Sequence, residues 1–250
     1  MTLAGTVNLS GGEFGGSGNI TLSGAFSWTG GYLGNTSGLS GSLTTTNSVD
    51  INPGGTGSSN AIQLYRPWTL SSGGTYTADS TGNSRVYFSG ANASLTIPAG
   101  QTLTINDVST DTAGYLADFD YSSGNATGLI NNGTLAITGS SSAIGLAIYS
   151  TFTNNGNISL PSGTRILTLG SNNVTLNSTT TFTGSGTFEV NSGTTTIPND
   201  LTLSIPFELT GGTLSGAGNL TLNGPFKWTG GNLGTYSGTN GSFTTNGTVT

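Results

Sequence analysis

The residues best suited to chemistry lie in the run Ala117–Tyr121, where Asp118 and Asp120 stand two positions apart. If this run is a strand, both carboxylates lie on one face of it. Paired carboxylates can act as general acid and base in glycoside hydrolysis, or supply oxygen ligands to calcium. We interpret them here as solvated, outward residues of an irregular rung. A weak calcium site at Asp118 and Asp120 is the alternative.

The same part of the chain offers a candidate carbohydrate-binding surface. Flat aromatic rings present apolar faces to sugar rings, while Arg and Asp side chains hydrogen-bond hydroxyl groups. The competing interpretation is that the aromatic side chains pack inside the fold. The residues proposed for glycan binding are Tyr65, Arg66, Trp68, Tyr87, Asp118, Asp120 and Tyr121.

Composition narrows the classes of function. The chain of 250 residues has 4 Lys and Arg against 10 Asp and Glu, with a net charge of −6. So few basic residues argue against a nucleic-acid partner. The absence of His and Cys removes the commonest general base, thiol chemistry and most zinc sites. We therefore expect no enzyme and no required cofactor.

The architecture that places these candidate residues in space is indicated by a repeat in the sequence. Residues 11–45 reappear without a gap at 211–245, and the two stretches agree at 21 of 35 positions. Self-similarity at a fixed offset marks a repeat architecture, in which each unit buries its apolar face against a neighbour. We interpret the chain as a segment of a longer tandem array, in which one full repeat runs from position 11 to position 210.

Within each copy, apolar residues alternate with polar or small ones, which indicates strands. The apolar positions are Ile20, Leu22, Phe26 and Trp28 in the first copy, and Leu220, Leu222, Phe226 and Trp228 in the second. We expect both tryptophans in the core.

The spacing of glycines predicts the fold class. Gly-Gly pairs begin at positions 11 and 30 in the first copy and at 211 and 230 in the second, which suits two or three short strands with tight corners. The two pairs in each copy are 19 residues apart, which is the length of one turn of a parallel β-helix. We predict an all-β fold, a single continuous β-solenoid over positions 1–250 with about 20 residues per rung. Residues 53–125, the least repetitive part, are expected to form irregular rungs with a binding surface.

The Gly-x-Gly units at 16, 184 and 216 and the Asn-Asn-Gly units at 131 and 154 occur in a Cys-free chain rich in Thr, Ser, Asn and Gly. In this texture the sequence resembles repeat regions of large secreted bacterial surface proteins, of the haemagglutinin and autotransporter-passenger type. The resemblance implies a right-handed β-solenoid that is exported and works as a stalk or adhesive rod.

We accordingly expect a non-enzymatic structural rod or adhesin segment, extracellular or on the cell surface, whose open ends stack on each other. The alternative is a carbohydrate-binding or carbohydrate-active β-helix, including the phage fibre or spike type, that uses residues 65–121. No stretch is apolar enough for a membrane span, and the first residues lack the pattern of a signal peptide. An export signal would then lie outside this segment.

Overall fold

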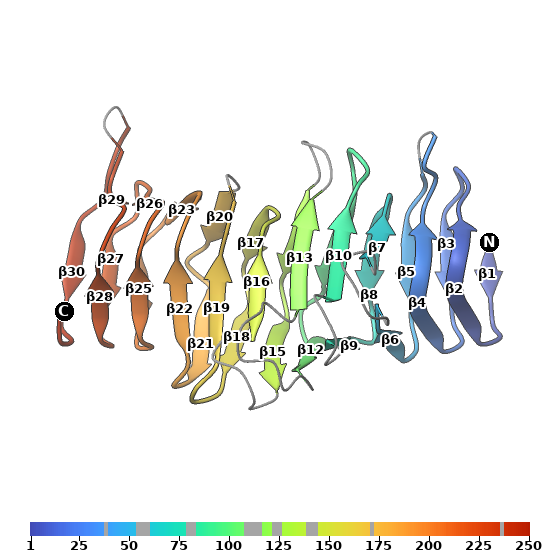
Figure 1. Ribbon diagram of the computed structural model, residues 1–250, viewed down its shortest axis with the longest axis horizontal. Coiled ribbons are helices and arrows are strands. Elements are labelled where there is room, and N and C mark those ends of the chain that lie inside the picture. Colours follow the sequence, from blue (N-terminus) through green and yellow to red (C-terminus); the bar gives the residue numbers. More distant parts are fainter. Residues whose placement is uncertain are drawn as a thin grey trace.

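The chain forms a β-solenoid of parallel strands stacked side by side, with roughly 23 residues per turn. The computed structural model describes residues 1–37, 40–53, 61–78, 84–107, 117–121, 127–138, 145–170, 173–235 and 238–250. In that part the regular elements are strands only. Figure 1 shows them in sequence order from one end of a rod to the other, with the two termini at opposite ends. The predicted fold class is confirmed, with turns slightly longer than expected.

One sheet runs the whole length of the rod. It has eleven strands, one from each turn: β1 (Thr2–Leu3), β3 (Ile20–Leu22), β5 (Leu43–Thr45), β8 (Pro67–Leu70), β11 (Ser94–Ile97), β14 (Gly128–Asn131), β17 (Phe152–Asn154), β20 (Asn173–Leu176), β23 (Thr194–Thr196), β26 (Thr213–Ser215) and β29 (Asn232–Leu233).

A second sheet of sixteen strands covers the other two sides. The long strand β4 (Phe26–Leu33) joins its two branches, because it pairs with β6 (Val49–Ile51) through its first half and with β7 (Ala61–Leu64) through its second. One branch contains β6 (Val49–Ile51), β9 (Gly74–Ala78), β12 (Thr102–Asp107), β15 (Thr134–Thr138), β18 (Asn157–Leu160) and β21 (Thr181–Gly184). The other contains β7 (Ala61–Leu64), β10 (Ser84–Phe88), β13 (Ala117–Tyr121), β16 (Leu146–Ile148), β19 (Arg165–Thr168), β22 (Thr187–Val190), β25 (Phe207–Leu209) and β28 (Phe226–Trp228).

The remaining strands belong to the ends of the rod. β2 (Val7–Phe14) pairs with β4, while β24 (Leu201–Leu203), β27 (Leu220–Leu222) and β30 (Phe243–Thr245) form a three-stranded sheet. Some equivalent strands of the two copies therefore lie on different sheets: β3 and β5 belong to the eleven-stranded sheet, whereas their copies β27 and β30 belong to the three-stranded one. The offset between the copies is not a whole number of turns.

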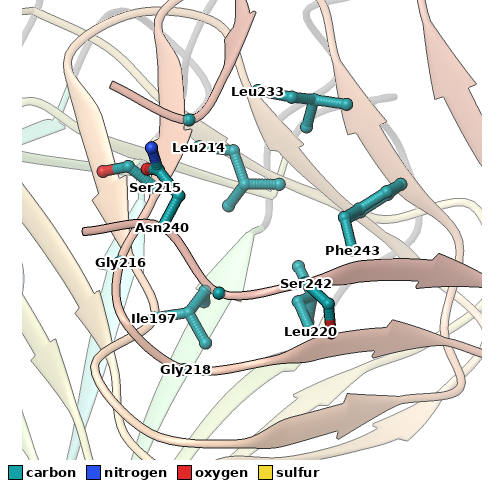
Figure 2. A pocket seen from close by; sticks show the side chains of 12 residues that line it. Ile197, Leu214, Ser215, Gly216, Gly218, Leu220, Leu233, Asn240, Ser242 and Phe243 are labelled. Atoms are coloured by element: carbon teal, nitrogen blue, oxygen red, sulfur yellow. The ribbon is translucent and has the colours of Figure 1, made fainter. Parts of the chain in front are cut away.

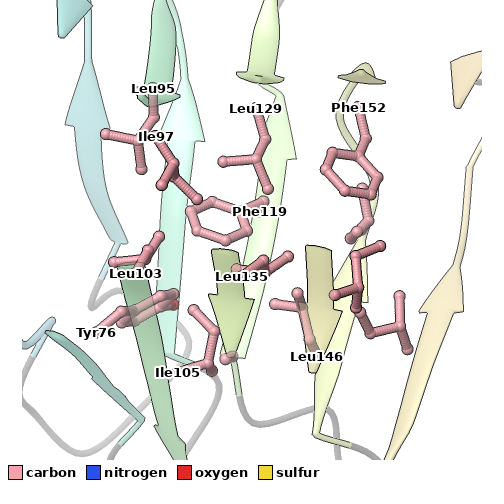
Figure 3. Packing of buried hydrophobic residues seen from close by; sticks show 14 of the residues in the cluster. Tyr76, Leu95, Ile97, Leu103, Ile105, Phe119, Leu129, Leu135, Leu146 and Phe152 are labelled. Atoms are coloured by element: carbon pink, nitrogen blue, oxygen red, sulfur yellow. The ribbon is translucent and has the colours of Figure 1, made fainter. Parts of the chain in front are cut away.

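The inward side chains of every turn fill one continuous core. Figure 3 shows this packing in the middle of the rod, where Leu95, Phe119 and Leu135 come from different sides of the coil and meet. The predicted alternation is confirmed there and at the odd-numbered run that begins at Leu201 and ends at Leu209, whose apolar residues are all buried. Branched and aromatic side chains suit such strands because they pack well on a pleated surface.

The expectation for the two tryptophans is right once and wrong once. Trp28 is fully buried, but Trp228 is 48% exposed. Both pair with a leucine of the preceding turn, Leu9 and Leu209 respectively. Trp28 is also covered by Trp68, with ring centroids 5.7 Å apart, whereas Trp228 lies in the last turn of the rod. The alternation along a strand determines whether a side chain points inward or outward. Whether an inward side chain is buried depends on the turn that follows it.

Asparagines stack between turns, as the Asn-Asn-Gly units suggest. Asn131 Nδ2 donates to Asn154 Oδ1 at 2.6 Å, and both side chains are buried. Asn154 Nδ2 in turn donates to Thr180 Oγ1 at 3.1 Å. Such bonds satisfy polar groups inside the wall and fix the register of successive turns.

Candidate functional site

The charged residues that form ion pairs gather on one side of the rod. We call this side the charged face: the outward side chains of β7, β10, β13, β16, β19, β22, β25 and β28. Every ion pair found among the described residues lies on it. The residues involved are Arg85, Asp118, Asp120, Arg165, Glu189, Glu208 and Lys227.

The first cluster joins β10 and β13. Their parallel register sets Arg85 beside Asp118 and Tyr87 beside Asp120. Arg85 Nε donates to Asp118 Oδ2 at 3.0 Å, and Arg85 Nη1 donates to the Tyr87 hydroxyl at 3.0 Å. Arg85 Nη1 also lies 3.9 Å from Asp120 Oδ2. The guanidinium thus bridges both carboxylates and the phenol.

Asp118 is fully buried although its parity points outward. Burial raises the pKa of this carboxyl to about 7, and Arg85 opposes the rise only in part. Asp118 Oδ1 has no hydrogen-bond partner among the described residues. For Arg85, burial lowers the pKa, but the Tyr87 hydrogen bond and the charge of Asp118 raise it overall. This is a coupled pair, and not the solvated residues expected from the sequence.

The second cluster lies on β19, β22, β25 and β28. Register places Glu189 beside Glu208, and their like charges are offset by two cations. Arg165 donates to Glu189 Oε2 and lies 3.7 Å from Glu208, while Lys227 Nζ lies 3.5 Å from Glu208 Oε2. These four residues neutralise one another, so they support the sheet better than they would bind a charged ligand.

Near the first cluster, a column of polar and aromatic side chains follows the charged face. Register aligns Tyr32 with Gln63, Gln63 with Tyr87, and Tyr87 with Asp120. Tyr32 is 39% exposed, and the other three are half-buried. Their outward spacing of one residue per turn, about 4.8 Å, presents a flat strip across four turns.

Two residues predicted to bind glycan lie inside the coil instead. Trp68 is 1% exposed and packs edge to face against Phe26 and Trp28. Arg66 is fully buried, and burial lowers its pKa. The packing interpretation is therefore confirmed for Trp68, because its even parity with Leu64 points it inward.

Asp118, also predicted to bind glycan, is buried beneath Arg85, and the four remaining predicted residues lie at or near the surface. Tyr87 and Asp120 belong to the column on the charged face. Tyr121, 37% exposed, ends β13. Tyr65 directly follows β7 and lies beside the column: its hydroxyl donates to Gln63 Oε1 at 2.8 Å, and its ring packs edge to face on Tyr32 at 6.0 Å.

Sequence analysis did not select Tyr32, Gln63 or Arg85 for this site. Tyr32 lies outside residues 53–125, and only the stacking of turns brings it beside Gln63. A signal was available in parity, since Tyr32 and Gln63 each precede an inward leucine of the same register pair, Leu33 and Leu64.

The carboxylates are poorly placed for a calcium ion. Arg85 lies against both Asp118 and Asp120, so a cation would have to displace it. Across the described ranges, no three acidic side chains converge in a way that could hold a metal. The sequence-based calcium alternative remains a prediction without a supporting contact.

No protein-family model, curated protein or solved structure matches this chain. The resemblance to bacterial surface repeats therefore stays a prediction based on sequence texture. A search of the described part for a helix long and apolar enough to cross a membrane found none.

Proposed function

We propose that the chain is a non-enzymatic structural rod, a stiff spacer or adhesin segment of an exported surface or filament protein. The single observation that supports this most is the eleven-stranded parallel sheet, which takes one strand from each turn from β1 to β29. Strands about 4.8 Å apart give this sheet a length of about 50 Å. Every turn is hydrogen-bonded to the next, so length is set by the number of turns.

A distance measurement tests whether the turns act as equal, independent units of length. The chain has no cysteine, so spin labels can be attached to Gln63→Cys on β7 and Lys227→Cys on β28, seven strands apart. We expect a narrow distribution of backbone separations near about 34 Å, from seven spacings of about 4.8 Å. Deleting residues 207–225 sets Phe226 in the place of Phe207 and should shorten the distance by about 4.8 Å.

The undeleted pair of labels is the control for that experiment. A broad distribution in the full chain, or a deletion that melts the rod instead of shortening it, would contradict the proposal. The deletion joins equivalent positions, because Phe207 and Phe226 both follow a proline and are paired in register on neighbouring strands.

End-to-end stacking of rods is part of the same proposal. β1 is the first strand of the eleven-stranded sheet and β29 the last, so each end presents strand edges that can pair. Met1 is 70% exposed at one end, and Val249 is 55% exposed at the other. Static light scattering should show mass rising with concentration; a constant monomer mass would count against stacking.

Carbohydrate binding is the second candidate, and the column Tyr32, Gln63, Tyr87 and Asp120 is the observation that favours it. Two outward phenol rings flank an amide, and a carboxylate ends the row, which suits the apolar faces and hydroxyls of a linear glycan.

A glycan array tests this second candidate. Tyr32→Ala and Tyr87→Ala should each abolish binding that the unchanged chain shows. Thr153→Ala, on the outer face of the eleven-stranded sheet, is the control and should bind normally. Trp68→Ala is unsuitable, since truncating a buried ring disturbs the core. Binding unaffected by both tyrosine changes would exclude the column as the site.

A further inference from the structure

A cavity lies beside the polar and aromatic column of the charged face, at the corner where β4, β7 and β10 end. Its volume is about 230 Å³. The wall is formed by three residues that follow β4, by Tyr65, which follows β7, and by residues 89–92, which follow β10. Because β2 precedes these three turns and β13 follows them, the cavity lies within the length of the rod and not at an end.

The space for this cavity comes from glycines that flank Tyr65. A Cβ on Gly34, in the preceding turn, would lie 2.7 Å from Tyr65 Cβ. A Cβ on Gly90, in the following turn, would lie 2.7 Å from the Tyr65 carbonyl oxygen. Gly34 also has a φ of +123°, which other residues rarely adopt. Neither glycine can be replaced without a shift of the backbone, so the space beside Tyr65 stays open.

Tyr65 and Ser89 connect this cavity to the column. Both side chains line the cavity, and both donate their hydroxyl to Gln63 Oε1, at 2.8 Å and 3.3 Å respectively. Two donors on one atom identify it as the amide oxygen. The Gln63 amide nitrogen makes no hydrogen bond to the described part of the chain, so it is available as a donor. Because the Tyr65 ring also packs on Tyr32 at 6.0 Å, an amide and two aromatic rings are held where the cavity meets the column.

The wall of the cavity offers hydrogen-bonding groups that the fold leaves unused. Asn35 Oδ1 accepts from the backbone N and the Oγ of Ser37, at 3.0 Å and 3.1 Å, but Asn35 Nδ2 donates to no atom of the described ranges. Asn92 is exposed at the rim and makes no hydrogen bond to those ranges either. Amide groups of this kind can donate to sugar hydroxyls and accept from them.

The charges near the cavity favour a neutral ligand. None of the described residues that line it is charged. Thr36, which is part of the wall, donates its Oγ1 to Glu13 Oε2 at 2.9 Å, and Asp120 ends the adjacent column. An acidic sugar would meet both carboxylates, and the repulsion between like charges disfavours it.

The volume of the cavity limits its ligand to a single ring. Drug-sized ligands occupy pockets of about 300 to 1,000 Å³, so the 230 Å³ of this cavity suits one pyranose residue. Figure 2 shows a cavity of another kind, of about 150 Å³, between Leu214, Leu220, Leu233 and Phe243. Those side chains are buried in the core or pack against it, so that cavity extends the apolar core. The corner cavity instead has polar walls and an exposed rim.

We propose that the column and the corner cavity together bind a neutral glycan that carries single-residue branches. The main chain follows the column along the rod, where turns about 4.8 Å apart present one side chain each. The branch enters the cavity and packs on the Tyr65 ring, while Asn35 and Asn92 bind its hydroxyls. Gln63 donates to the glycan at the branch point. The inference rests on the carbohydrate-binding candidate above and narrows the class of ligand for that site.

A glycan array with matched pairs tests the inference on the full chain. Each pair is an unbranched neutral backbone and the same backbone with single-sugar branches: cello-oligosaccharides without and with xylose, and manno-oligosaccharides without and with galactose. We expect the branched member of at least one pair to bind at least tenfold more tightly than its unbranched partner. The same backbone with glucuronic acid branches is the charge control and should show no gain.

Two variants locate the branch in the cavity. Ala91→Trp, at an exposed position of the wall, fills the cavity with a ring and should reduce the tenfold preference to less than twofold. Asn92→Ala removes one amide and should reduce the preference at least threefold. Ala99→Trp, in the exposed turn after β11, is the matched control and should keep the preference. Thermal melting confirms that each variant is folded.

Three results would overturn the inference: equal binding of branched and unbranched glycans, an equal gain from acidic branches, or a full preference in both cavity variants. In each of them the backbone still binds, so the carbohydrate-binding candidate itself stands. If no glycan of any pair binds, that candidate fails together with the inference.

Discussion

The two copies of the repeat have closely similar sequences and different surroundings. Trp28 is fully buried between turns, while its copy Trp228 is 48% exposed. Leu33 is fully buried, and its copy Leu233 is only half-buried. What differs is the next turn, which supplies Leu64 and Trp68 to the first copy. In a solenoid, a residue's direction is local, but its burial comes from a neighbour.

The two copies also place some equivalent strands on different sides of the rod. Because the offset between the copies does not complete a whole number of turns, β1, β3 and β5 lie on one sheet and their copies β24, β27 and β30 on another. Sequence identity between copies therefore does not place equivalent side chains on one side of the rod.

The largest predicted effect of this difference is on stability. Trp28→Ala removes a ring packed on Trp68 and should cost about 3 to 5 kcal/mol of unfolding free energy. Trp228→Ala, at an exposed position, should cost less than about 1 kcal/mol. Denaturant unfolding of the two variants measures both values. Equal losses would show that the neighbouring turn does not control the contribution of the residue.

Much of the fold follows from sequence because the repeat and the alternation are visible in the chain without knowledge of any contact between turns. They are sufficient for the parallel coil, the inward side of each strand and the stacking of asparagines such as Asn131 and Asn154. The single predicted turn length of about 20 residues was less accurate, because the turns differ in length. Asn131 and Asn154, stacked on neighbouring turns, are 23 residues apart, whereas Asp200 and Asn219 are 19 apart.

The candidate site was harder to predict because its contacts cross turns. Arg85 meets Asp118 across 33 residues, and Arg66 reaches Gly16 across 50. Neither separation equals the spacing of the Gly-Gly pairs. Trp68 follows the inward parity of its strand, so alternation could have placed it in the core. Asp118 follows the outward parity and is still buried, which alternation does not reveal.

Equivalent glycines of the two copies should also differ in their tolerance of alanine, with a smaller effect on stability than the tryptophans. A Cβ on Gly218 would lie 2.2 Å from the backbone of Asn199 in the preceding turn, whereas a Cβ on Gly18 would meet nothing within 4 Å. Neither residue has a positive φ. Gly218→Ala should therefore cost about 2 to 3 kcal/mol through overpacking. Gly18→Ala should be neutral or slightly stabilising.

Thermal unfolding of the two alanine variants measures this difference, with the unchanged chain as reference. A Gly18→Ala variant as unstable as Gly218→Ala would mean that both positions are crowded, and that the first turn has a neighbour on its outer edge in solution.

The smallest predicted effect concerns pH, and it extends the contrast between direction and burial to the charged face. Burial raises the pKa of Asp118 from 3.8 to about 7, so the folded chain holds this proton more tightly than the unfolded chain does. Stability should fall as pH rises between these values, by about 2 kcal/mol from pH 5 to pH 7. Asp118→Asn should remove most of this slope, and Asp200→Asn, at an exposed position, should retain it. Denaturant unfolding at several pH values measures the slope. A stability that is flat or rising over this range would mean that Arg85 compensates the buried carboxylate fully.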